Sequence, residues 1–140
     1  MHIDSYKKIQ RIDGHKINLI NFEKDKIEKK QLVKNKAKKN LWFVNIGVYN
    51  PNSMQEKHEF GLVIASNKLE AKNIAKSKWL IGCKKKHKDD LASLEKLISC
   101  DDCELIKKID NWRIELTPDK DFIQENNYPD WYGFQKIDGK

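Results

Sequence analysis

The stretch Leu41-Trp42-Phe43-Val44-Asn45-Ile46-Gly47-Val48-Tyr49 is the longest apolar run in the chain, and it is rich in β-branched and aromatic residues. Successive residues of a strand point to opposite faces of a sheet, so the apolar side chains of this run fall on both faces. We therefore expect residues 41–49 to form a central strand that is covered on both sides. A second run, Phe60-Gly61-Leu62-Val63-Ile64-Ala65, follows a turn and is expected to pair with it.

The segment after these strands has the pattern of an amphipathic helix. Asn67 can cap its start, with Glu70 at the spacing of a capping box, and Gly82 stands where a helix end favours glycine. We expect the helix to pack on the sheet face that Trp42 or Phe43 presents. Its apolar stripe consists of Ala71, Ile74, Ala75 and Trp79.

Two turn signals predict β-hairpins. Asp13-Gly14, a strong signal for a type I′ turn, joins two short strands within residues 6–20. Asp110-Asn111 joins a strand over residues 103–109 to one over residues 112–117. The residues of the last strand that alternate toward the core are Trp112, Ile114 and Leu116.

A second, shorter helix is expected to begin at Asp89 or Asp90. Its apolar stripe consists of Leu91, Leu94, Leu97 and Ile98. Together the elements predict an α+β fold, in which one main helix and one short helix pack on a mainly antiparallel sheet.

The composition bounds the class of protein. The chain has 140 residues, which suit one compact domain, and no apolar run approaches the ~20 residues that span a bilayer. No secretory signal is expected, and an odd number of cysteines, three, argues against a disulfide framework. We therefore expect a cytoplasmic protein. The net charge is +7, but arginine, which nucleic-acid readers usually use for bidentate contacts, occurs only at Arg11 and Arg113.

The first hairpin resembles the last one. Residues 12–19 line up with residues 109–116, and His2-Ile3-Asp4 echoes His87-Lys88-Asp89. This layout resembles a bacterial family known as a domain of unknown function, in which each unit runs strand, acid-x-His, strand, helix, Gly, His-x-Asp and hairpin. Glu56-Lys57-His58 matches the acid-x-His. The resemblance implies a fold built from one full and one partial repeat unit, and it implies no activity.

The chain then divides into a remnant hairpin of a first repeat at residues 1–22, a basic linker at 23–40, a complete repeat unit at 41–117 and a tail at 118–140, all within one compact domain. The start is interpreted as truncated, or the gene as split. The orphan hairpin would add to the sheet of the second unit or pair across a homodimer or higher homo-oligomer. The tail carries five aromatic residues, so we expect it to dock on the body.

Four residues are of the types that bind metals or act as acids and bases, namely Glu56, His58, His87 and Asp89. If the elements that carry them converge, two imidazoles and a carboxylate could hold a divalent metal with an open position. The alternative is that each is a local cap or hydrogen-bond anchor, as Asp89 would be at the start of the short helix.

A second set has the ligand types of a zinc site and consists of Cys83, His87, Cys100 and Cys103. The two-residue gap between Cys100 and Cys103 is typical of a zinc knuckle, but Asp101-Asp102 adds negative charge beside the thiolates. The alternatives are ordinary buried or half-buried cysteines and a thiol redox role, which is weaker because Cys100 follows a helix instead of opening one.

Lysine-rich stretches could bind a polyanion such as nucleic acid or could be a solvated surface. Their residues are Lys29, Lys30, Lys36, Lys38, Lys39, Lys84, Lys85, Lys86 and Lys88. No phosphate-binding glycine loop, dinucleotide fingerprint or hydrolase motif is found. We interpret the chain as a non-enzymatic binding module that self-associates and has no membrane partner. No cofactor is predicted, although the set Glu56, His58, His87 and Asp89 could bind a divalent metal. Polyanion binding and metal-dependent hydrolysis are the alternatives.

Overall fold

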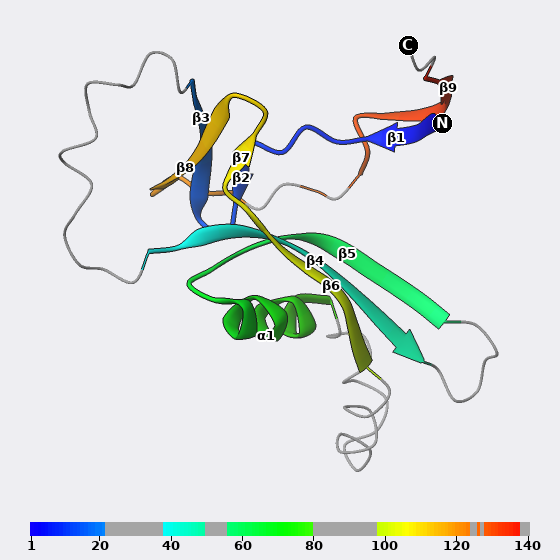
Figure 1. Cartoon of the computed structure of the whole chain (residues 1–140), viewed down its shortest axis with the longest axis horizontal. Helices are drawn as coiled ribbons and strands as arrows, with labels where there is room; N and C mark the ends of the chain where they lie inside the picture. Colours follow the sequence, from blue (N-terminus) through cyan, green and yellow to red (C-terminus); the bar gives the residue numbers. More distant parts are fainter. Residues whose placement is uncertain (22–37, 50–55, 80–97, 124–125, 127, 138–140) are drawn as a thin grey trace.

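The structure is a computed structural model, and it describes residues 1–21, 38–49, 56–79, 98–123, 126 and 128–137. The elements in chain order are β1 (His2–Tyr6), β2 (Arg11–Ile12), β3 (His15–Asn21), β4 (Asn40–Tyr49), β5 (Glu56–Ala65), α1 (Lys68–Trp79), β6 (Ile98–Ile106), β7 (Lys108–Ile109), β8 (Trp112–Pro118) and β9 (Trp131–Lys136). The strands form antiparallel sheets in the orders β5-β4-β6, β2-β3-β8-β7 and β1-β9 (Figure 1). The predicted α+β fold is confirmed. The predicted short helix falls mostly on residues 80–97, which lie outside the described part.

The core lies between α1 and one face of the β5-β4-β6 sheet (Figure 1). β4 is the central strand of this sheet, as predicted. The expected cover on both sides is only partial among the described residues, because Leu41 is buried on the face opposite α1 but Phe60 of β5 is 68% exposed there. Val44 and Ile46 of β4 and Val63 of β5 are fully buried, and α1 contributes the buried residues Ala71 and Ala75. These side chains belong to the core cluster, and their burial stabilises the packing of α1 on the sheet.

The helix covers the face of the sheet that carries Trp42. This residue belongs to the core cluster, and its Nε1 donates to the carbonyl of Ala65 at 3.0 Å. Phe43, the next residue of the strand, lies on the opposite face. Trp79 of α1 packs over Gly61, where a Cβ would lie 2.9 Å from the indole Cζ2. The expected packing of the stripe on the Trp42 face is therefore confirmed.

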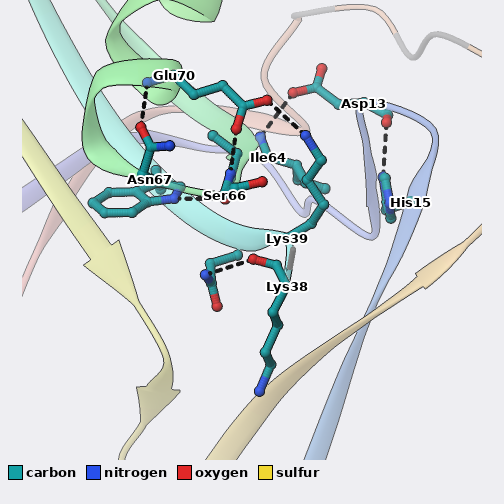
Figure 2. A network of polar contacts seen from close by, with 11 residues as sticks. Asp13, His15, Lys38, Lys39, Ile64, Ser66, Asn67 and Glu70 are labelled. Atoms are coloured by element: carbon teal, nitrogen blue, oxygen red, sulfur yellow. Dashed lines mark hydrogen bonds and ion pairs between the residues drawn. The ribbon is translucent and has the colours of Figure 1, made fainter. Parts of the chain in front are cut away.

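The start of α1 is held by the predicted capping residues (Figure 2). Asn67 Oδ1 accepts the N–H of Glu70 at 2.9 Å, and Glu70 Oε2 accepts the N–H of Ser66 at 2.7 Å. Lys39 donates from Nζ to Glu70 Oε1 at 2.7 Å. Lys39 first and the Ser66 N–H second lower the pKa of Glu70 to about 2. The carboxylate of Glu70 thus joins the residues before β4 to the helix start.

The predicted hairpins lie side by side in the second sheet, where β3 pairs with β8. Asp13 and Gly14 have φ of 47° and 75°, both positive as a type I′ turn requires. The equivalent turn between β7 and β8 has Asp110 at φ 50°. The two predicted hairpin turns are therefore present.

The two hairpins are alike in detail. Ile17 donates its N–H to the carbonyl of Gln10 at 2.8 Å, and Ile114 donates its N–H to the carbonyl of Lys107 at 2.9 Å. These residues occupy matching positions when residues 12–19 are aligned with residues 109–116. The two hairpins thus share this backbone hydrogen bond at equivalent positions.

β1 and β9 form a two-stranded ribbon that lies away from α1 and the core (Figure 1). The β1 strand was not predicted. The aromatic tail was expected to dock on the body, but β9 pairs with β1, and Tyr132 and Phe134 remain 81% and 71% exposed. Tyr6 stacks on Trp131 with ring centroids 5.9 Å apart. The described strand of the tail therefore pairs with the first residues of the chain.

Three strand boundaries differ from the predictions. β5 begins at Glu56, so residues 56–59, predicted as part of a connection, belong to the strand. β6 begins at Ile98, which was predicted to lie in the short helix. The predicted strand 103–109 is divided near Lys107, because β6 pairs with β4 and β7 pairs with β8. Residues 56–59 are all polar, so the sequence lacks the apolar alternation by which a half-buried strand is recognised.

Trp112 was predicted to point inward, but it is 43% exposed. It lies in β8, in the sheet of the two hairpins, whereas α1 packs on the strands β4, β5 and β6. Alternation predicted which residues share a face of β8, but it could not show how completely that face is covered.

Candidate functional site

The face of the β5-β4-β6 sheet opposite α1 carries a group of polar side chains around Gly47. This glycine follows a residue that faces α1, so it lies on the other face, and it is the pairing partner of His58 on β5 and Ser99 on β6. A Cβ at Gly47 would lie 2.7 Å from Glu56 Oε1, 2.9 Å from Ser99 Oγ and 3.2 Å from Asp101 Oδ2. Because glycine has no side chain, groups from both edge strands can meet over the central strand.

His58 contacts a carboxylate with each of its ring nitrogens. Nε2 lies 3.4 Å from Glu56 Oε2, and Nδ1 lies 3.1 Å from Asp101 Oδ2. Ser99 donates from Oγ to Asp101 Oδ1 at 2.9 Å. One ligand atom from each of Glu56, His58 and Asp101 lies within 4.8 Å of the other two, and all three side chains are exposed. Such a group can hold a metal ion or exchange protons with a bound molecule.

A β-bulge in β6 brings Asp101 into this group. Asn45 of β4 pairs with Asp102 and Ile46 pairs with Cys100, so Asp101 is an extra residue between the two pairs. Its carboxylate reaches across Gly47 to His58. No feature of the sequence marks the bulge, and Asp101 was considered only as a negative charge beside the cysteines.

The same bulge places Cys100 and Cys103 on one face of β6. Two residues three positions apart in a regular strand would point to opposite faces, but here both cysteines belong to or pack against the core under α1. Cys103 is buried, and desolvation raises the pKa of its thiol. Burial therefore disfavours the thiolate form that a zinc ligand requires.

The structure places only part of each predicted set. Glu56 and His58 come together, whereas His87 and Asp89 lie outside the described residues. In the alternative zinc set, Cys100 and Cys103 of β6 are free thiols. The other two members, Cys83 and His87, lie outside the described residues.

Of the lysines predicted to contact a polyanion, Lys38 and Lys39 are described. Lys39 pairs with Glu70, so its charge already stabilises the helix start. Lys38 is exposed, and its carbonyl accepts a hydrogen bond from Asn40 Nδ2 at 3.1 Å (Figure 2). The remaining members, which lie outside the described residues, are Lys29, Lys30, Lys36, Lys84, Lys85, Lys86 and Lys88.

Residues 53–116 match the model of a Domain of Unknown Function, DUF1543. The predicted resemblance to an uncharacterised domain family is thereby confirmed. The DUF1543 match includes β5, α1, β6 and most of β8, and it therefore contains Glu56, His58 and Asp101.

Among solved structures, the chain is similar to the crystal structure of a protein Il1583 from Idiomarina loihiensis. The two share 23% sequence identity with a TM-score of 0.56, over 96% of this chain and 63% of the other. The chain thus spans less than two thirds of the length of that protein, and the likeness concerns the fold alone. No curated protein matches the chain. Within the described residues, no helix is long and apolar enough to cross a membrane.

Proposed function

We propose that this protein is a non-enzymatic binding module that self-associates, and that the β1–β9 ribbon is the contact surface. The observation that carries the proposal is the exposure of aromatic side chains on a ribbon of two strands. Tyr132 and Phe134 of β9 project into solvent, and Tyr128, just before β9, is 76% exposed. Exposed aromatic side chains of this kind are enriched at protein–protein contacts.

The ribbon has little to support it within one chain. Among the described residues, β1 and β9 pair only with each other, and a lone two-stranded sheet is marginally stable in water. The ring contacts of Tyr6 with Trp131 and of His2 with Phe134 hold the strands together on one side only. A partner that adds strands or apolar surface would stabilise the ribbon.

A second copy of the chain fits this surface. The ribbon and its flanks carry both signs of charge, since Lys7, Lys8 and Lys136 lie near Asp4 and Asp130. In a two-fold arrangement the same patch faces itself. A patch of mixed charge can face its own copy with opposite charges opposed.

Light scattering on the purified chain tests the proposal. We expect the mass of a dimer or higher oligomer, and a monomer for the double variant Tyr132→Ser/Phe134→Ser. Phe60→Ser is the matched control, because Phe60 is also an exposed aromatic residue on a strand but lies on β5. A wild-type monomer across the micromolar range, or an oligomer that the double variant leaves intact, would contradict the proposal. Circular dichroism of each variant verifies that the fold is retained.

Polyanion binding and metal-dependent hydrolysis stay predictions. The described lysine Lys39 is engaged by Glu70, and the other predicted polyanion contacts, Lys38 apart, lie outside the described residues. The proposed module is therefore defined by the ribbon.

A further inference from the structure

We propose that Glu56 and His58, supported by Asp101, form a binding site for a divalent transition ion of the Zn²⁺ class. The site lies on the face of the β5-β4-β6 sheet opposite α1, and it is separate from the ribbon. An imidazole together with a carboxylate suits Zn²⁺ and its first-row neighbours better than Mg²⁺ or Ca²⁺, which prefer oxygen ligands alone.

The distances fit two ligands of one ion. His58 Nε2 and Glu56 Oε2 are 3.4 Å apart. Two ligands of a tetrahedral zinc ion, each with a bond of about 2.0–2.1 Å, lie roughly 3.3–3.4 Å from one another. Both side chains are exposed, so water can fill the other positions of the ion.

Asp101 acts on the ring of His58 as a positioning residue. Its Oδ2 lies 3.1 Å from Nδ1, so it accepts the N–H of that nitrogen and leaves Nε2 with the free electron pair that a metal needs. Ser99 holds the other carboxylate oxygen of Asp101 at 2.9 Å. This chain of carboxylate, imidazole and ion is the usual arrangement around a metal-bound histidine.

Gly47 provides the space for the site. A methyl group at this position would approach Glu56 Oε1 to 2.7 Å, and it would also contact Ser99 and Asp101. The contacted atoms are the ends of side chains, so the sheet can persist while the carboxylates move. Gly47→Ala therefore changes the geometry of the site and leaves every ligand in place.

Calorimetric titration of Zn²⁺ into untagged, chelator-treated protein tests the proposal. We expect one equivalent to bind to the wild type. His58→Ala should lower the affinity more than about tenfold, and Asp101→Ala by about 10–100-fold, as is usual for a group that orients a ligand. Asp101→Asn should lose less, because its amide oxygen still accepts the N–H of His58. Gly47→Ala should also weaken binding.

His2→Ala is the matched control, because His2 also pairs with a carboxylate, Asp4 Oδ1 at 3.1 Å, but lies on the ribbon. It should bind Zn²⁺ as the wild type does. Cys100→Ser tests for a thiol site, because Cys100 is the more accessible cysteine of β6. Far-UV circular dichroism of each variant verifies the fold.

Any one of three results would contradict the proposed site. The wild type does not bind Zn²⁺, His58→Ala binds Zn²⁺ as tightly as the wild type does, or Cys100→Ser is the only variant that loses binding. The double variant Tyr132→Ser/Phe134→Ser is expected to bind Zn²⁺ normally. A failure of the metal site and a failure of self-association are therefore distinguishable.

Discussion

The carboxylate of Asp13, in the turn between β2 and β3, accepts the backbone N–H of Ile64 on β5 at 3.0 Å (Figure 2). Its other oxygen forms an ion pair with Lys78 of α1. One side chain thus connects the hairpin sheet to the edge of the other sheet and to the helix. The hydrogen bond also occupies a donor on β5 that would otherwise be unpaired at the sheet edge.

Asp13→Ala is expected to destabilise the protein by about 1–3 kcal/mol, because it leaves the N–H of Ile64 and the ammonium of Lys78 without their acceptor. Urea unfolding measures the loss. Asp110→Ala is the matched control, since Asp110 has the same positive φ in the other hairpin turn and is exposed. If both substitutions cost the same, the effect of Asp13 comes from its backbone conformation and the linking role is wrong.

Gly61→Ala is expected to cost about 1–3 kcal/mol, because the added methyl would lie 2.9 Å from Cζ2 of Trp79. The same substitution in a Trp79→Leu background should cost less than about 1 kcal/mol, because the smaller side chain leaves room for the methyl. Chemical unfolding of the four proteins of this cycle gives the coupling. An equal cost in both backgrounds would show that the methyl added at position 61 does not clash with the indole of Trp79.

Asn67→Ala is expected to lower the free energy of unfolding by about 0.5–2 kcal/mol, because the N–H of Glu70 loses its acceptor. The control is Asn73→Ala, an exposed position inside the same helix, where alanine should be neutral or slightly stabilising. Thermal unfolding at neutral pH compares them. A control as destabilised as Asn67→Ala would contradict the capping role.

The free energy of unfolding should depend on pH through the carboxyl group of Glu70. Its pKa in the folded protein is about 2, below the ordinary value of 4.5, so the folded state binds this proton less tightly than the unfolded chain does. The stabilisation is present above about pH 4.5 and is lost as the pH falls toward 2. Glu70→Gln should flatten this part of the curve of unfolding free energy against pH. Glu104→Gln, on an exposed residue of β6, should leave it unchanged.

The parts of the fold that follow from local chemistry could be predicted from the sequence. The central strand, the capped helix and the two hairpin turns each depend on a short run of residues with a clear periodicity or turn preference. Two of the three sheets depend on pairings between residues about a hundred or more positions apart, such as Asn18 with Glu115 and His2 with Lys136. No local pattern specifies such pairings.

The candidate site could be predicted only in part. Glu56 and His58 are only two positions apart, so they lie close together whatever the local structure, although residues 56–59 were predicted as a connection and form part of β5. Asp101 joins them through a bulge, and Gly47 makes room for them in a third element. A bulge changes which face a residue occupies without changing the composition of the strand.

The pairing of the first strands with the last ones has a consequence for biosynthesis. β1 needs β9 and β3 needs β8, so both wait until residues 112–136 have left the ribosome. Contacts between such distant segments form slowly, and strands that lack partners are prone to aggregate in the meantime. The nascent chain therefore carries β1 and β3 without these partner strands until residues 112–136 have been synthesised, and in that time their free edges can pair with other chains.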